Sequence, residues 1–398
     1  MRFLTVTFLL AVGCGDNSVA TPDAPIVPDA PTGFVEAPHA NVPQVISGGG
    51  PVTTAPKVVP IFFTGDSDAQ VQLEMFLGAL VGSSYWTATT SEYGVGPLTI
   101  APSIVSTDAP LTTDAALQTW LAAKTDGTHP GWPAPDVNTI YTVFLPAGVV
   151  LDQGGGNLSC KAFGAYHSEA PDAHGGQLTY ALVPRCASTL GTVVDTATVA
   201  TSHELVEAAT DPLPFTNNAF VQLDDEHFVW GRTPGGELGD MCEYITAAPQ
   251  RMVGNFLVQR TWSNASALAG HDPCVPVLAT PYAGAAPAFD DITITTHSGT
   301  ITTKGETIAV GESKTIEVTL FSDAEGPDWT VGATDAAALL GGSASLQFQW
   351  GRQYGHNGTK LQLIITRTKA ATGMRGNEFV ITSNVNNVMV AMWWGLVN

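Results

Sequence analysis

The sequence predicts an α/β domain followed by an all-β sandwich domain, and two observations carry this prediction. Strand-like and helix-like segments alternate from about residue 42 to residue 280. From about residue 288 to residue 398, runs of β-branched residues are separated by glycine turns, without helical periodicity before the C-terminal segment. The alternation of strands and helices is typical of an α/β fold, and the β-branched runs with glycine turns are typical of a sandwich of about 100 residues.

The start of the chain has the pattern of an export signal. In residues 1–14, Arg2 precedes an apolar run that is too short to span a bilayer, and the small residue Gly13 precedes Cys14. This resembles a bacterial lipoprotein cleavage site. We therefore expect an exported protein, attached to the outer membrane through lipidated Cys14 or else secreted. Residues 15–41, rich in Pro, Asp and Ala, are expected to form a disordered tether.

Charge and cysteine content narrow the class of protein. The chain has 15 Lys and Arg against 36 Asp and Glu, a net charge of -21, which argues against nucleic acid and anionic membrane surfaces as partners. Besides Cys14 there are four cysteines, and an even number in an exported chain predicts two disulfides. Sequence order favours Cys160–Cys186 and Cys242–Cys274, with the other two pairings open.

The α/β domain is predicted element by element. Residues 57–65 form a buried strand, and residues 68–86 form a helix with apolar residues at Val71, Met75, Leu77 and Leu80. A second helix begins at Asp114, and further strands begin at residues 138 and 178. The last helix of the series begins near Asp195, a plausible N-cap, and ends at Asp211 before Pro212.

That last helix contains the stretch TSHELVEAATDP, residues 201–212. Residues four apart on a helix are separated by about 40°, so His203 and Glu207 project side by side, while Glu204 points about 100° away from His203. His203 and Glu207 could share a zinc ion, and Glu204 could then act as general base, as in H-E-x-x-H enzymes. A solvated helix that merely contains His-Glu is the simpler alternative.

Several motifs in the same order support the metal hypothesis. They are LSCKAFGAYHSE, YALVPRC, SHELVEAATDP, GGELGDMCE, FLVQRTWSN and HDPC, between about residues 159 and 274. Together they resemble the Exordium, or phosphate-induced, protein family and its bacterial relatives, which look like zincin-type metallopeptidases. The resemblance implies a zincin-like fold for residues 42–280 and carries over His203, Glu204, Glu207, Glu237 and Asp240 as site positions.

A zinc site also needs a third protein ligand. Glu237 is the first candidate, because gluzincin-like sites take a downstream glutamate, and Asp211 is the second. His167 could be another ligand, or a catalytic donor to a developing oxyanion, or a histidine packed beside the disulfide. An ion site at His227 with Asp224 and Asp225 lacks the spacing of a calcium loop.

Two functions follow as expectations. The first is a zinc-dependent hydrolase of the cell surface, a metallopeptidase acting on a peptide or protein substrate. The second is a non-catalytic extracellular or cell-wall module with a structural or relic metal site, in which the sandwich binds a cell-surface glycan or a protein.

Overall fold

The computed structural model describes residues 33–187, 190–296, 299–370 and 377–398. The predicted signal segment 1–14, with Cys14, and residues 15–32 of the predicted tether lie outside the described residues. Within the described part of the chain, no helix combines the length and the apolar character needed to cross a membrane.

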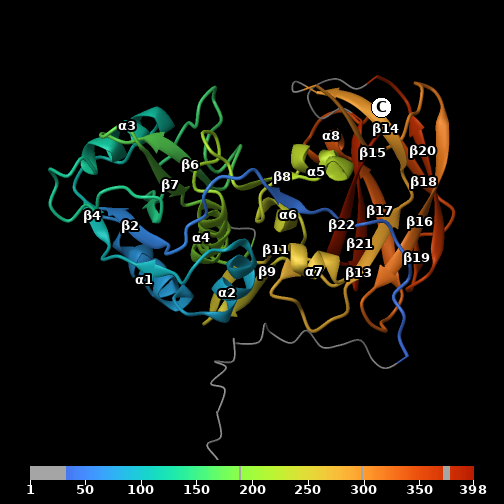
Figure 1. The fold of residues 1–398 in the computed structure, drawn as a ribbon, viewed down its shortest axis with the longest axis horizontal. Helices are drawn as coiled ribbons and strands as arrows, with labels where there is room; N and C mark the ends of the chain where they lie inside the picture. The colour runs from blue at the N-terminus through green and yellow to red at the C-terminus, as the bar shows by residue number, and fades with distance from the viewer. Residues whose placement is uncertain (1–32, 188–189, 297–298, 371–376) are drawn as a thin grey trace, which may run out of the picture.

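The first half of the chain is built around a mixed sheet (Figure 1). Its strand order is β3-β2-β5-β7-β6, and β4 also pairs with β2. The strands are β2 (Lys57–Phe63), β3 (Thr99–Ile100), β4 (Ile104–Ser106), β5 (Thr139–Phe144), β6 (Tyr166–Pro171) and β7 (Gln177–Val183). All pairings are parallel except that of β6, which lies antiparallel to β7 at the edge. The predicted strands at 57, 138 and 178 are thus present, whereas β6 was not predicted.

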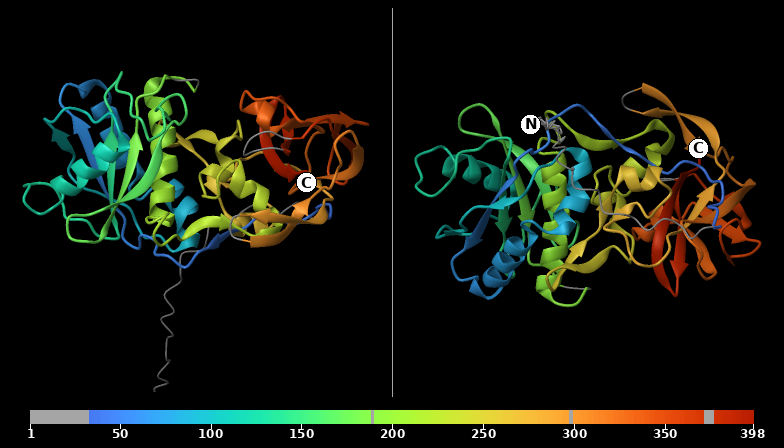
Figure 2. Two further views of the ribbon diagram at one scale, coloured as in Figure 1. Left: turned by 90° about the horizontal axis from the view of Figure 1, so that it is seen from above. Right: turned by 60° about the horizontal axis from the view of Figure 1, so that its bottom comes forward.

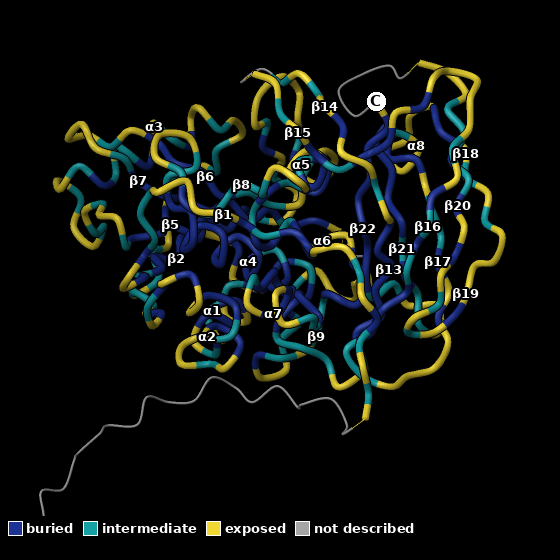
Figure 3. Tube along the Cα trace, turned by 45° about the vertical axis from the view of Figure 1, so that its right-hand side comes forward, coloured by how far each residue is buried: buried dark blue, intermediate teal, exposed yellow. Residues whose placement is uncertain are grey.

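Helices cover both faces of this sheet, because successive strand residues point to opposite sides. On β5, Ile140 and Phe144 pack with α1 (Ser67–Leu80), α2 (Ser84–Thr90) and α4 (Val193–Thr210). Tyr141 and Val143 pack on the other face with α3 (Asp114–Lys124). A short 3₁₀ turn, η1 (Ser91–Tyr93), follows α2. The sheet therefore lies between two helical layers, and α4 is in the buried interior (Figure 3).

Three details of the predicted helices differ in the structure. The helix expected over residues 68–86 is divided into α1 and α2, because the backbone becomes extended at Val81. Of its four predicted apolar positions, Leu77 and Leu80 are buried, whereas Val71 and Met75 are exposed, since Leu73 and Phe76 complete the packed face. The N-cap of α4 is Thr192, and Asp195 is the third helical residue, whose carboxylate accepts a hydrogen bond from the Thr192 backbone N–H.

A less regular region connects α4 to the sandwich. It contains η2 (Asp225–His227), α5 (Phe228–Arg232), α6 (Asp240–Glu243) and α7 (Asn264–Leu268), with strands β8 (Phe220–Leu223), β9 (Pro249–Val253), β10 (Phe256–Gln259), β11 (Thr261–Trp262) and β12 (Cys274–Val275). β9 pairs with β10, β11 with β12, and β8 with the N-terminal strand β1 (Val45–Ser47). Disulfides join Cys160 to Cys186 and Cys242 to Cys274, the pairing that sequence order favours.

The C-terminal part consists of two four-stranded antiparallel sheets and a hairpin. One sheet has the order β13-β16-β20-β18 and the other β19-β17-β21-β22. The bounds are β13 (Ala283–Pro287), β16 (Ser313–Ser322), β17 (Trp329–Asp335), α8 (Ala336–Leu339), β18 (Leu346–Trp350), β19 (Tyr354–Gly355), β20 (Lys360–Arg367), β21 (Glu378–Val385) and β22 (Val388–Leu396). The rings of Phe348 and Phe379, one from each sheet, are 5.3 Å apart, so the sheets share a core. The hairpin is β14 (Asp290–Thr296) with β15 (Gly299–Gly305).

The two halves of the molecule are packed against each other. The ring of Trp230 in α5 lies 5.9 Å from that of Trp262 and 6.1 Å from that of Trp393 in β22. Arg232 forms an ion pair of 3.0 Å with the fully buried Glu378 of β21. The N-terminal segment, residues 33–47, runs from the sandwich to the α/β half (Figure 2). At its sandwich end, the Ala37 N–H donates a hydrogen bond to the side chain of Asn357.

Candidate metal centre

Helix α4 places three predicted site residues in the interior. His203, Glu204 and Glu207 are 9%, 4% and 2% exposed, so the helix is not a solvated surface helix with a chance His-Glu pair. Nε2 of His203 lies 3.1 Å from Oε1 of Glu207, as their spacing along the helix predicts. Val206 and Ala209 share the buried environment, and apolar packing on both sides fixes the helix against the sheet.

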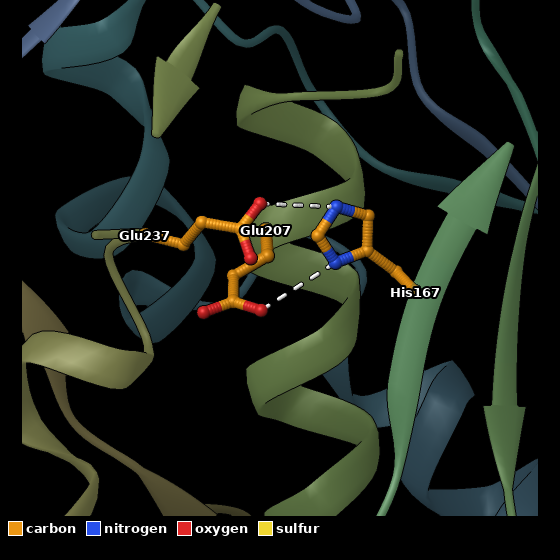
Figure 4. A group of neighbouring side chains, drawn as sticks. All are labelled: His167, Glu207 and Glu237. Atoms are coloured by element: carbon orange, nitrogen blue, oxygen red, sulfur yellow. Dashed lines mark ion pairs between the residues drawn. The ribbon is translucent and has the colours of Figure 1, made fainter. Parts of the chain in front are cut away.

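Strand β6 brings His167 to the centre of the same cluster. Its Nδ1 lies 3.5 Å from Oε2 of Glu207 and 3.7 Å from Oε2 of Glu204. Its Nε2 lies 3.3 Å from Oε1 of Glu237, so that the ring is held between two glutamates (Figure 4). From the sequence, a histidine packed beside the disulfide was an equal alternative for His167. The structure places His167 among the glutamates of the cluster.

The segment 237–240 approaches α4 through a glycine. The backbone N–H groups of Gly239 and Asp240 each donate to Oε1 of Glu207 at 3.1 Å. A Cβ atom at Gly239 would lie 2.7 Å from that oxygen and 2.8 Å from Nδ1 of His203, so a larger residue could not take this position without displacing the site. The close approach brings Oδ1 of Asp240 to 3.6 Å from Nε2 of His203.

Gln259, at the end of β10, is a site residue that sequence reasoning did not identify. Its Oε1 lies 3.1 Å from Nδ1 of His203, and its Nε2 donates to the carbonyl of Gly239 at 2.7 Å. It therefore links the helix to the segment 237–240. The motif FLVQRTWSN contains this residue, but nothing in its local pattern shows that β10 lies beside α4.

Asp211 lies at the edge of the cluster. Its side-chain Oδ1 accepts a hydrogen bond of 2.6 Å from the backbone N–H of Ala219, while its carbonyl oxygen lies 3.2 Å from Nε2 of His167. Oδ2 is buried and makes no hydrogen bond with the described residues. The side chain thus orders the turn after α4, and the groups of potential ligands found in the described chain do not include it.

The cluster concentrates negative charge in a buried place. Burial raises the pKa of Glu237 to about 8 and that of Asp240 well above its usual range. Burial alone would lower the pKa of His167 and His203, but the neighbouring carboxylates raise both well above the ordinary value. Burial alone would raise the pKa of Glu207, but the two imidazoles hold it well below its usual range. A bound cation would compete with these protons.

The structure groups the potential ligands differently from the sequence. The predicted set was His203, Glu207 and Glu237. Ligand atoms of His167, Glu207 and Glu237 lie within 4.8 Å of one another, and so do those of His203, Glu204 and Glu207. Glu207 belongs to both sets. A separate group, Asp224, Glu226 and His227, lies at η2, and both nitrogens of His227 there have hydrogen-bond partners, Asp224 and the Asn41 carbonyl.

Comparison of the chain with protein-family models, with curated proteins and with solved structures finds no match.

Proposed function

We propose that the protein is a divalent-metal-dependent hydrolase, with zinc as the expected ion and a peptide or protein as the expected substrate. One observation carries the proposal. The imidazoles of His167 in β6 and His203 in α4 both approach Glu207, and each also lies beside a carboxylate of the segment 237–240. Among the described residues, the ion-pair partners of these carboxylates are histidines and not lysine or arginine. A bound cation would take the place of the protons that otherwise balance the charge of these buried carboxylates.

The residues fit the proposed ion. Zinc binds imidazole nitrogen and carboxylate oxygen, and catalytic zinc sites combine these ligand types in sets of three. His167, Glu207 and Glu237 supply one nitrogen and two carboxylates from three separate segments (Figure 4). Oε1 of Glu237 is buried without a hydrogen-bond partner in the described chain, as expected for an atom that awaits an ion.

Glu204 is assigned the role of general base. Zinc, when bound, would polarise the substrate carbonyl and make a water molecule more acidic. The Glu204 carboxylate stands next to Glu207 on the same face of the cluster, with Oε2 3.7 Å from His167. It can accept the proton of the attacking water and return it to the leaving amine, so that one carboxylate serves both steps. Burial raises the pKa of Glu204, which makes the carboxylate a stronger base than a solvated glutamate.

Solvent reaches the centre from the segment 237–240. The side chains of Glu237 and Asp240 are 17% and 22% exposed, whereas those of His167 and Glu207 are 3% exposed. A substrate would therefore approach over this segment, with α4 and β6 forming the back of the site.

The same burial favours a second function, a non-catalytic module that holds a structural ion. An ion closed off behind His167 and Glu207 would join β6, α4 and the segment 237–240 without turning over a substrate. In that case the binding of a glycan or protein would be a property of the rest of the surface.

The two functions are separated by one substitution. We expect Glu204→Gln to keep the fold and the bound zinc but to reduce cleavage of a mixed peptide library by at least about 100-fold, because the amide cannot accept the proton. Zinc is measured by elemental analysis and cleavage by mass spectrometry. The matched control is Glu74→Gln, which changes an α1 carboxylate whose hydrogen-bond partner is Gln70. Zinc without cleavage in the wild type would favour the structural ion, and a wild type without zinc would refute both functions.

A further inference from the structure

We propose that the centre holds two divalent ions, one on each side of Glu207, with the carboxylate of Glu207 as the bridge. This rests on the proposed function in that it assumes a metal centre at these residues, and it adds a second ion position that the single predicted zinc does not use.

The two carboxylate oxygens of Glu207 face different histidines. Oε2 faces Nδ1 of His167 at 3.5 Å, and Oε1 faces Nε2 of His203 at 3.1 Å. The two imidazoles come from different elements, β6 and α4, and lie on different sides of the carboxylate. A carboxylate that binds one ion as a terminal ligand needs only one of these approaches.

Besides Glu207, each of the two imidazoles lies beside one further carboxylate. Nε2 of His167 lies 3.3 Å from Oε1 of Glu237, and Nε2 of His203 lies 3.6 Å from Oδ1 of Asp240. Glu237 and Asp240 are three residues apart in one segment. The result is two histidine–carboxylate pairs that share Glu207. Glu207 is also the residue common to the two overlapping groups of potential ligands, in the second of which Glu204 accompanies His203.

Gln259 orients the imidazole ring of His203. Gln259 donates its Nε2 hydrogen to the Gly239 carbonyl, which leaves its Oε1 facing Nδ1 of His203. In the neutral ring the hydrogen is therefore on Nδ1, and Nε2 presents a lone pair toward Glu207 and Asp240. Histidine ligands usually donate their other ring N–H in this way to a fixed oxygen. A cation at this place would be shared by Nε2 of His203 and Oδ1 of Asp240, with Oε1 of Glu207 beside them.

The backbone of segment 237–240 stabilises the bridging orientation. The N–H groups of Gly239 and Asp240 both donate to Oε1 of Glu207. They fix the rotation of the carboxylate, so that Oε1 stays on the His203 side and Oε2 on the His167 side. Ions in two-metal hydrolytic sites lie about 3.5–4 Å apart, a spacing that a bridging carboxylate can span. The expected ions are first-row divalent cations that accept nitrogen and oxygen ligands.

The test is the number of ions per chain. The full chain is saturated with Zn²⁺, freed of excess by gel filtration, and analysed by elemental analysis. We expect two equivalents in the wild type, and one equivalent in Asp240→Asn and in Glu237→Gln, since each removes the second carboxylate of one position. Glu74→Gln and Asp224→Asn are matched controls on α1 and at η2, and both should keep two. With Mn²⁺, the wild type should give the electron paramagnetic resonance spectrum of two coupled ions.

Each result decides the proposal. One equivalent in the wild type overturns the second position and leaves the proposed function standing, whereas none refutes both. Two equivalents that persist in both site variants, or that fall in Asp224→Asn, place the second ion elsewhere and overturn the proposal. Variants are compared only when they elute as single species with the wild-type circular dichroism. If Asp240→Asn does not fold, the wild-type Mn²⁺ spectrum decides, because isolated ions lack the coupling.

Discussion

Gln259 is the clearest case of a residue whose role depends on its side-chain amide. Its amide lies between Nδ1 of His203 and the carbonyl of Gly239, and both contacts are buried. It touches no other ionisable group of the centre directly in the described structure. Its effect on a bound ion would therefore act through the orientation of His203, as is usual for residues behind a metal ligand.

We expect Gln259→Met to weaken zinc binding by about 10–100-fold, the range found when such orienting partners are removed. Methionine keeps the length of the side chain, and it removes the hydrogen bonds to His203 and Gly239. The measurement is competition for zinc with a chelator of known affinity. Gln250→Met is the control, because Gln250 bonds the Ala247 carbonyl away from the centre. Unchanged affinity in Gln259→Met would show that His203 is oriented without it.

At this scale the sequence could predict only what is local. His203, Glu204 and Glu207 follow from helix geometry, since their relative positions depend on about one turn of one helix. Glu237 and Asp240 entered through the motif resemblance. The roles of Gln259 and Gly239 depend on how β10 and the segment 237–240 dock against α4, which no local pattern contains.

Among the elements, α4 is stabilised by reciprocal hydrogen bonds at its start. The Thr192 hydroxyl accepts from the Asp195 N–H at 3.0 Å, and the Asp195 carboxylate accepts from the Thr192 N–H at 2.9 Å. Arg251 adds an ion pair of 2.9 Å with Asp195. Because α4 carries three residues of the metal centre, this capping box supports the site as well as the helix.

Asp195→Asn tests the cap through pH. Burial alone would raise the pKa of Asp195, but the hydrogen bonds from Thr192 and the charge of Arg251 lower the pKa below the ordinary value of an aspartate. A carboxylate with a lowered folded-state pKa stabilises the fold above its unfolded-state pKa, and this is lost as pH falls through the folded-state pKa. We expect the variant to be less stable than wild type at pH 7, with a difference that shrinks below about pH 4. Urea unfolding at several pH values measures this, and a difference independent of pH would contradict it.

The missed and misplaced elements have physical reasons. β6 is an edge strand of sequence YHSEAP, without the apolar alternation that identifies strands, because polar residues here serve the cluster and the turn after α4. The helix predicted over 68–86 has the correct buried positions Leu77 and Leu80, but an apolar-rich segment fits more than one helical face. Tertiary packing buries Leu73 and Phe76 with them and leaves Val71 and Met75 exposed.

For the whole molecule, the boundary between the α/β half and the sandwich is an interior. Trp230, Trp262 and Trp393 pack together, Arg232 pairs with the buried Glu378, and the Ala247 N–H donates to the Met389 carbonyl. The sequence predicted the change of texture near residue 288, where β14 and the sandwich strands follow. It could not predict this packing, because Trp393 lies more than a hundred positions from both Trp230 and Trp262 in the sequence.

We therefore expect one unfolding transition in calorimetry for the full chain, since domains that share a core unfold together. A chain ended at residue 281 should expose the apolar surface around Trp230, bind a hydrophobic dye and aggregate. Ala→Gly at exposed Ala115 of α3 is a control that should lower stability slightly without dividing the transition. Two separate transitions in the full chain, or a folded truncated chain, would show that the halves are independent.

The first described segment of the chain has a consequence for the order of events during synthesis. Ala37 is bonded to Asn357, a sequence separation of 320, and Val45 pairs with Leu223 in β8. Because a chain emerges from its N-terminus, the partner of Ala37 is made after nearly all of the remaining polypeptide, and the partner of Val45 after about half of it. Such distant contacts are slow to form. We therefore expect residues 33–47 to dock late in folding, against two halves whose own strands have already paired.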